Sequence, residues 1–165
     1  MYTDNESRKK LYGLIEDARF AMITTVNEDG TLYSCPMTLQ ECDDNGHLWF
    51  FLEKECETAR NLQANMNLNL GFANPGDDEY VAISGLGQLI DNRARIAELW
   101  KEPLRAWFPE GQDDPKIALL RVDPQSGQFW DSPSSTLEMV VGYVKSLLGS
   151  KEGRTGIDSN RKVMM

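Results

Sequence analysis

Short apolar runs separated by tight-turn residues constrain the fold of this chain more than any other feature of its sequence. The run Phe20–Val26 is rich in Ile, Thr and Val, and an Asp29-Gly30 turn leads from it into a second extended run at 31–39. This combination is typical of a β-hairpin. A turn at 43–46 then leads into a third run at 47–52. We therefore predict three consecutive strands joined by turns.

Helices and further strands are predicted along the rest of the chain. The apolar residues of 7–18 share one helical face, so this segment is expected to form an amphipathic helix. Helical segments are also expected at 55–64, at 91–100 with Asp91 as its cap, at 103–108 and at 137–148. Strands are expected at 68–73, 80–90, 117–122 and 127–130, with Asp123-Pro124 as a turn between the last two.

Tight turns join most of these six or seven strands, and no regular alternation of strands and helices is visible. This pattern favours a small closed or partly closed barrel over a doubly wound sheet. A chain of 165 residues is long enough for one buried core and too short for two ordinary domains. We expect a mainly β domain with flanking helices over residues 1–148, followed by a mobile tail over 149–165.

The charge of the chain argues against two classes of partner. It has 26 acidic and 17 basic residues, giving a net charge of −9, which repels nucleic acids and anionic membranes. The first ten residues are polar, and no apolar run approaches the roughly 20 residues that span a bilayer. We therefore expect a cytoplasmic protein that binds neither nucleic acid nor membrane.

The cysteines and the single histidine do not indicate a disulfide framework or a metal site. Cys35, Cys42 and Cys56 are odd in number and contain no CxxC spacing, which indicates reduced thiols. His47 follows Cys42 within a turn, and two such side chains are too few for a closed zinc site. The thiol of Cys35 could be a small buried group or a redox-sensitive group facing a cleft.

Aromatic residues cluster at two places in the sequence. Trp49, Phe50 and Phe51 are expected to belong to the barrel core and to contacts between subunits. A second group is expected to anchor a helix on the barrel, and consists of Trp100, Trp107 and Phe108.

Several short sequence pieces, taken in order, resemble a known family. They are Val81-Ala82-Ile83-Ser84-Gly85, Asp91-Asn92-Arg93-Ala94-Arg95-Ile96, Glu98-Leu99-Trp100, Ala106-Trp107-Phe108-Pro109-Glu110-Gly111, Asp113-Asp114-Pro115 and Phe129-Trp130-Asp131-Ser132-Pro133-Ser134-Ser135. The chain resembles, over residues 8–148, the general stress protein 26-type branch of the pyridoxamine 5′-phosphate oxidase-like split barrels. The resemblance implies a Greek-key split β-barrel that forms a homodimer and binds flavin mononucleotide (FMN) in two clefts between the subunits.

The same resemblance implies a set of flavin-binding residues. Ser34, Cys35, Pro36 and Met37 correspond to positions along the flavin ring and its ribityl chain, and Phe51 and Leu52 to a contact pair on the next strand. Glu57 and Thr58 fall where the phosphate loop of the family opens a helix, with Arg60 shortly after them. Tyr80 and Trp130 match positions that approach the cofactor, and Asp131 and Ser132 adjoin Trp130.

The chain departs from the family at the expected phosphate site. Cys35 replaces an Arg, and Thr58 lies in a loop where relatives carry Lys. Between residues 20 and 91 there are only two cations, Lys54 and Arg60, against twelve acidic residues. Because phosphate is usually held by Arg or Lys, this set is poorly suited to the phosphate of FMN. Backbone N–H groups at the start of the 55–64 helix, Arg60, or arginines at 93, 95 or 105 of a partner chain could compensate.

Two functions therefore remain open. The first is a flavin-dependent oxidoreductase related to general stress proteins. The second is a non-enzymatic split-barrel dimer that has lost tight flavin binding and serves as a ligand-binding or structural stress protein. A true pyridoxamine 5′-phosphate oxidase is not expected, because its second phosphate site needs Arg and His where this chain has Asp, Ser, Pro, Ser and Ser after Trp130. No catalytic residue is assigned.

Overall fold

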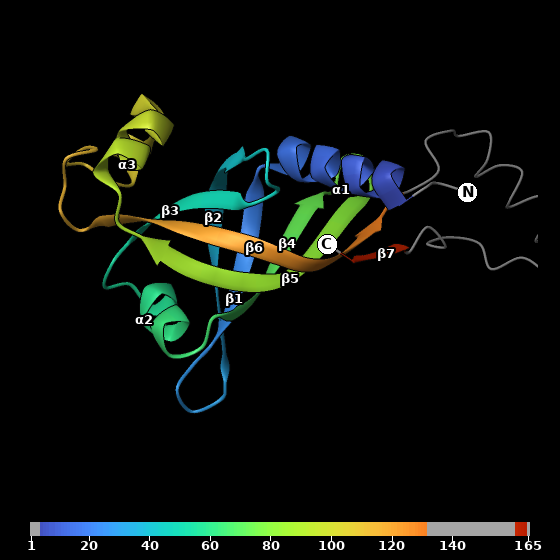
Figure 1. Ribbon diagram of the computed structural model, residues 1–165, viewed down its shortest axis with the longest axis horizontal. Coiled ribbons are helices and arrows are strands. Elements are labelled where there is room, and N and C mark those ends of the chain that lie inside the picture. The colour runs from blue at the N-terminus through green and yellow to red at the C-terminus, as the bar shows by residue number, and fades with distance from the viewer. Residues whose placement is uncertain (1–3, 132–160, 165) are drawn as a thin grey trace, which may run out of the picture.

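One antiparallel sheet forms the body of the molecule, with the strands in the order β3-β2-β1-β4-β5-β6-β7 (Figure 1). The structure, a computed structural model, describes residues 4–131 and 161–164. The strands are β1 Phe20–Val26, β2 Leu32–Cys42, β3 Leu48–Glu53, β4 Asn67–Asn74, β5 Glu79–Ile90, β6 Ile117–Trp130 and β7 Arg161–Met164. The helices are α1 Asp4–Ala18, α2 Glu57–Ala64, α3 Arg93–Leu99 and the 3-10 helix η1 Glu102–Ala106.

Pairing between β3 and β6 closes the first six strands into a barrel. Strands β1, β2 and β3 follow one another through tight turns, and β4 returns through α2 to lie on the other side of β1. The spatial order β4-β1-β2-β3 is that of a Greek key. The predicted mainly β barrel with flanking helices is therefore confirmed.

The first hairpin forms as its turn residues predict. Gly30 has a φ of 85°, which a residue with a side chain adopts only with strain. The carboxylate of Asp29 accepts hydrogen bonds from the backbone N–H of Thr31 at 2.9 Å and from its hydroxyl at 2.6 Å. The boundaries of β1 are those expected from its sequence, whereas β2 continues beyond the expected end to Cys42.

The predicted turn at Asp123-Pro124 is wrong, because residues 117–130 form one continuous strand. The register between β5 and β6 shifts here, and Pro124 lies opposite Gly85. A β-carbon on Gly85 would lie 2.6 Å from the carbonyl oxygen of Asp123, so only glycine accommodates this approach. The irregularity also tolerates a proline, which cannot donate a hydrogen bond within a regular sheet.

Two separate hydrophobic cores hold the fold together. The larger fills the barrel and includes Ile23, Phe50 and Phe129, with Leu11 and Ile15 of α1 packed against them. The smaller lies between the outer side of β3 and β6 and the helices α3 and η1, and consists of Trp49, Phe51, Ile96, Leu99, Leu104, Ile117 and Leu119. Each buried Leu, Ile or Phe contributes about 1.5–3 kcal/mol.

The aromatic predictions are confirmed for Phe50 in the barrel core and for Trp100 and Phe108. Trp49 and Phe51 belong instead to the smaller core outside the barrel, and the expected contacts between subunits stay a prediction. The side chains of residues 49–51 are all buried, and Phe51 packs against Trp100 and Phe108 with ring centroids 5.8 Å and 6.1 Å apart. Trp107 does not anchor the helix, because 71% of its surface is exposed. The chain leaves η1 at Trp107, and Phe108 rather than Trp107 reaches Phe51.

The cap of α3 also differs from the prediction. The side chain of Asn92 accepts a hydrogen bond from the backbone N–H of Arg95 at 3.1 Å, so Asn92 and not Asp91 is the cap. Asp91 instead binds Lys54 at 2.5 Å and Arg93 at 2.7 Å. The residue with extended backbone directly before the first helical turn takes the capping role.

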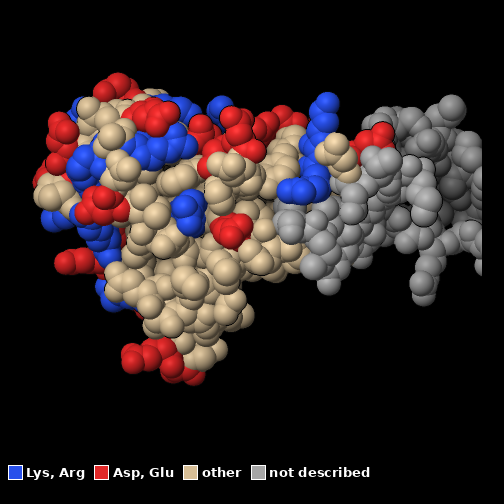
Figure 2. Space-filling model, in the orientation of Figure 1, with Lys and Arg blue, Asp and Glu red and all other residues tan. Residues whose placement is uncertain are grey.

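The C-terminal part of the chain is only partly described. Strand β7 pairs antiparallel with β6, so residues 161–164 of the expected tail belong to the sheet. The expected helix at 137–148 lies outside the described residues. Within the described ranges, no helix is long and apolar enough to cross a membrane. Charged side chains of both signs gather over α1 and α3, whereas the region above the acidic tip of the β1–β2 hairpin is mostly uncharged (Figure 2).

Candidate functional site

Large apolar side chains are exposed on one outward side of the sheet. Along β1, Ala21, Ile23 and Thr25 point inward and are buried, so the intervening residues point outward. Four outward side chains on β1, β2 and β5 are exposed by 43–70%, namely Phe20, Met22, Leu32 and Tyr80. We call these four residues, together with Pro36 opposite Met22, the exposed apolar face.

The strand register shows that Tyr80 belongs to this face. Met22 pairs with Gly71, and Gly71 pairs with Ala82. Tyr80 lies two residues before Ala82 and therefore points to the same side. It pairs in turn with the half-buried Trp130 of β6. The face thus extends across β2, β1, β4, β5 and β6.

Four of the predicted flavin-binding residues lie on this side of the sheet. Ser34 and Pro36 are at its β2 edge, and Tyr80 and Trp130 are at its other edge. The hydroxyl of Ser34 is 2.7 Å from the hydroxyl of Thr24 on the neighbouring strand. Together with Thr24, the four residues provide aromatic and aliphatic surface with a pair of hydroxyl groups at one edge.

Cys35 and Met37 point to the other side of β2. Cys35 pairs with the buried Ile23, and Met37 packs against the barrel core. The sulfur of Cys35 lies 3.2 Å from the hydroxyl oxygen of Thr58, the second residue of α2. Thr58 is only 1% exposed. The two positions at which this chain departs from the family pattern are therefore in contact.

Helix α2 is held against β1 by a buried asparagine. Asn61 donates hydrogen bonds to the hydroxyl of Thr25 at 3.0 Å and to the side-chain oxygen of Asn27 at 2.7 Å. Unpaired polar groups are costly in a protein interior, so these bonds fix the helix on the strand. They place the start of α2 beside Cys35.

The start of α2 is acidic, and its one cation is paired. Arg60 donates hydrogen bonds to the carboxylate of Glu57, at 2.5 Å, and to the backbone carbonyl of Glu55. The bond to Glu57 raises the pKa of Arg60. Cys56 precedes the helix and makes no side-chain capping bond, and burial raises the pKa of its thiol. Lys54, the other cation of the region, binds Asp91.

The remaining predicted residues lie apart from the exposed apolar face. Leu52 belongs to the barrel core, and Phe51 belongs to the smaller core beneath α3. Asp131 forms an ion pair with Lys10 of α1. Ser132 lies outside the described residues. The structure therefore brings together two subsets of the prediction, one on the outward face and one at the start of α2.

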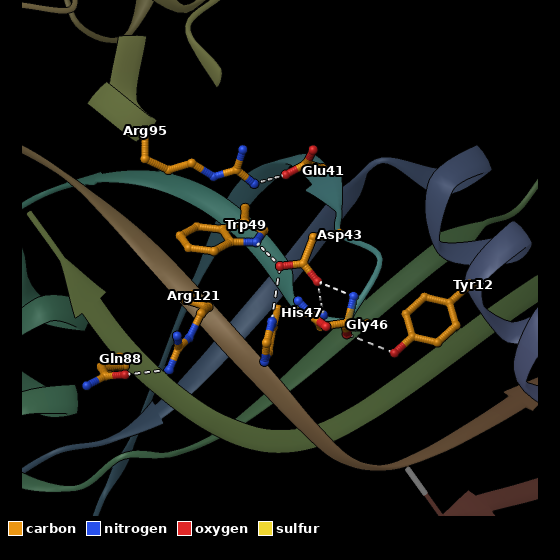
Figure 3. A network of polar contacts seen from close by, with 10 residues as sticks. Tyr12, Glu41, Asp43, Gly46, His47, Trp49, Gln88, Arg95 and Arg121 are labelled. Atoms are coloured by element: carbon orange, nitrogen blue, oxygen red, sulfur yellow. Dashed lines mark hydrogen bonds and ion pairs between the residues drawn. The ribbon is translucent and has the colours of Figure 1, made fainter. Parts of the chain in front are cut away.

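Sequence reasoning missed a polar network on the outer side of β3 (Figure 3). Asp43 accepts a hydrogen bond from the indole N–H of Trp49 at 2.9 Å, and its carboxylate lies 3.0 Å from Nδ1 of His47. Burial opposes ionisation of Asp43, but the hydrogen bonds from Trp49 and His47 outweigh it and lower its pKa to about 2. Arg95 stacks over the ring of Trp49 at 4.8 Å. The alternation of side chains along the predicted strand 47–52 places residues 47 and 49 on the same side. This was the sequence signal that could have indicated the network.

The backbone N–H and the ring of His47 are therefore both held by Asp43. Within the described part of the chain, no group of three or more His, Cys, Asp or Glu side chains is arranged to hold a metal ion.

Comparison with known proteins identifies the family of this chain. The sequence model for pyridoxamine 5′-phosphate oxidase-like proteins matches residues 6–153. The chain belongs to this family. Among the pyridoxamine 5′-phosphate oxidase-like proteins, General stress protein 26 of Bacillus subtilis (strain 168) is 26% identical over 133 residues, covering 78% of this chain and 91% of the relative.

Two solved structures of related proteins resemble the fold. The general stress FMN/FAD binding protein of Xanthomonas citri is 31% identical and has a TM-score of 0.67, with 79% of this chain and 92% of that chain covered. General Stress Protein 26 of Bacillus anthracis str. Sterne is 19% identical and has a TM-score of 0.66, with 74% and 92% covered. The chain is therefore assigned to the general stress protein 26-type branch of the family, as the sequence resemblance predicts.

Proposed function

We propose that two copies of this chain associate through the exposed apolar face and bind a flavin between them, and that the dimer acts as a flavin-dependent oxidoreductase. The observation that carries this proposal is the exposure of Phe20, Met22, Leu32 and Tyr80 on the side of the sheet that also holds Ser34 and Pro36. A relative in Xanthomonas citri is described as an FMN/FAD binding protein.

The exposure of these side chains supports association. Leu32 is 70% exposed and Phe20 is 62% exposed, although both are large and apolar. Several large apolar side chains exposed on one side of a sheet are typical of an interaction site. A second copy of the same face is the simplest cover, because most homo-oligomers are two-fold dimers with self-complementary contacts.

The residues on this face fit the planar part of a flavin. Pro36, Tyr80 and Trp130 provide flat apolar surface, and Ser34 and Thr24 provide hydroxyl groups that can exchange hydrogen bonds. A bound flavin would supply hydride or electron transfer. The role of the chain is to bind and orient the ring and to exclude water from it.

The residues at the start of α2 do not fit the phosphate of FMN. Cys35 and Thr58 are uncharged and bound to each other, and Arg60 is held by Glu57. No reaction step is assigned to this end of the site. The same contact favours a second candidate function, a dimer that binds a ligand without tight FMN binding and without catalysis.

Purified protein tests both candidates. Light scattering should give twice the mass of one chain, and titration with riboflavin and FMN should give saturable quenching of flavin fluorescence. Bleaching of the bound flavin by a reduced pyridine nucleotide would distinguish the oxidoreductase from the ligand-binding dimer. A monomer at all concentrations, or no saturable binding of either flavin, would contradict the proposal.

A further inference from the structure

We propose that the flavin bound by this chain is one without a phosphate, of the riboflavin class, and that a terminal phosphate adds nothing to its affinity. This inference rests on the proposed function, since it names the ligand class of the same site. It follows from the charges and contacts around the start of α2.

The first observation is an uncharged contact where an anionic group would need a cation. The sulfur of Cys35 and the hydroxyl oxygen of Thr58 are hydrogen-bonded at 3.2 Å, and Thr58 is almost completely buried. A thiol and a hydroxyl can each donate or accept a hydrogen bond, which suits a hydroxyl group at the end of a ligand. Neither carries the positive charge that makes a hydrogen bond to phosphate strong.

The second observation concerns the two cations between residues 20 and 91. Lys54 binds Asp91 at 2.5 Å, and Arg60 binds Glu57 at 2.5 Å and the carbonyl of Glu55. A phosphate would have to displace these partners to use either cation. The net gain would be small, because one charge-assisted bond would replace another.

The third observation concerns Arg93, Arg95 and Arg105, the arginines of a partner subunit that the sequence suggests as substitutes. Each of the three candidates on α3 and η1 is paired with a carboxylate of its own chain. The pairs are Arg93 with Asp91 at 2.7 Å, Arg95 with Glu41 and with Glu98 at 2.8 Å, and Arg105 with Glu102 at 3.1 Å. In a dimer of identical chains, the partner's arginines have the same carboxylates beside them.

The fourth observation is the surplus of negative charge. Glu53 and Glu55 precede α2, and Glu57 occupies its first turn, where a carboxylate already interacts favourably with the helix terminus. A phosphate monoester adds about −1.5 to −2 charges near pH 7. In a chain of net charge −9, this group is repelled and a neutral hydroxyl is not.

The decisive experiment titrates the full-length, flavin-free protein with riboflavin and with FMN by fluorescence quenching. We expect riboflavin to bind as tightly as FMN or more tightly. FMN binding more than threefold tighter would overturn the inference and leave the proposed flavin site standing. Failure of both flavins to saturate would overturn the proposed function and the inference together. The two failures are therefore distinguishable.

The Glu57→Gln variant tests the role of charge directly. It removes the carboxylate partner of Arg60 and leaves its bond to the carbonyl of Glu55, so FMN affinity should rise by about three- to tenfold while riboflavin affinity stays unchanged. The matched control is Glu16→Gln, which removes one negative charge from the exposed side of α1, away from α2 and from the three candidate arginines. The control should change neither affinity. An unchanged FMN affinity in Glu57→Gln, or an equal rise for riboflavin, would overturn the inference.

Salt provides an independent measurement. Raising the ionic strength to about 1 M shortens the Debye length to about 3 Å and screens repulsion between exposed charges. FMN affinity should rise relative to riboflavin affinity under these conditions. A relative fall would indicate attraction between the phosphate and a cation, and would overturn the inference.

Discussion

The thiol of Cys35 on β2 lies 3.2 Å from the hydroxyl of Thr58 on α2, so strand and helix meet through two uncharged side chains. An arginine at position 35 would bring a cation to the start of α2. We expect Cys35→Arg to tighten FMN binding by about tenfold and to leave riboflavin binding unchanged. Calorimetric titration measures both affinities.

Cys35→Ser is the matched control for this variant. A serine hydroxyl keeps a hydrogen bond to Thr58 and adds no charge, so the preference between the two flavins should not change. An equal preference in the Arg and Ser variants would mean that the ligand does not extend to α2.

A charge placed on the exposed apolar face should prevent association. Met22 is 48% exposed at the centre of this face, between Pro36 and Gly71. Burying two unpaired carboxylates in a two-fold interface costs several kcal/mol, so we expect Met22→Glu to be monomeric. Light scattering over a range of concentrations measures the mass.

Trp107→Glu is the control for that experiment. Trp107 is 71% exposed but lies after η1, outside the exposed apolar face. This variant should keep the mass of the unmodified protein. A dimeric Met22→Glu protein would show that the subunits meet elsewhere.

The Asp43 carboxylate should stabilise the fold in a pH-dependent way. Hydrogen bonds from Trp49 and His47 overcome the effect of burial and lower its pKa to about 2, below the value of about 3.9 expected in the unfolded chain. The stabilisation is therefore complete above about pH 4 and disappears as the pH falls toward 2. Thermal unfolding of Asp43→Asn should show a deficit at neutral pH that shrinks over this interval.

Asp44→Asn is a suitable comparison, because Asp44 is the exposed neighbour in the same turn. Its unfolding temperature should follow that of the unmodified protein at every pH. A deficit in Asp43→Asn that stays constant down to pH 2 would show that the ionised carboxylate is not the stabilising form.

At Gly85, where the register between β5 and β6 shifts, any side chain should be destabilising. In Gly85→Ala, the new methyl group would lie 2.6 Å from the backbone oxygen of Asp123, which cannot rotate away. We expect destabilisation of about 1–3 kcal/mol, measured by urea unfolding. Gly13→Ala within α1 meets nothing within 4 Å and should instead stabilise by about 0.5–1 kcal/mol. Equal stability of the two variants would contradict the register described for β5 and β6.

Local signals in the sequence were sufficient for much of the barrel. The alternation in Phe20–Val26 and the glycine at position 30 define the first hairpin, because inward side chains and a positive φ are local properties. The Asp123-Pro124 pair also resembles a turn when only its neighbouring residues are considered. Its actual conformation depends on Gly85, almost forty positions earlier in the chain, and could not be inferred from neighbouring residues.

The candidate site was predictable only in part, for a similar reason. Alternation along β2 separates Ser34 and Pro36 from Cys35, and the sequence pattern implies this separation. The burial of Phe51 depends on Trp100 and Phe108, which arrive from a distant segment. The carboxylate partners of Arg60, Arg93 and Arg95 likewise become visible only when side chains are placed.

Strand β3 is buried on both sides, since Phe50 faces the barrel interior and Phe51 faces the helices outside it. Its partner β6 begins more than sixty residues later in the chain. During synthesis, this run of five apolar residues therefore lacks its partner strand β6 until residues 117–122 have been made. An unpaired apolar run of this kind is prone to self-association. Charged residues stand on both flanks, with Asp43 and Asp44 before it and Glu53, Lys54 and Glu55 after it. Charges that flank an apolar strand in this way oppose its aggregation.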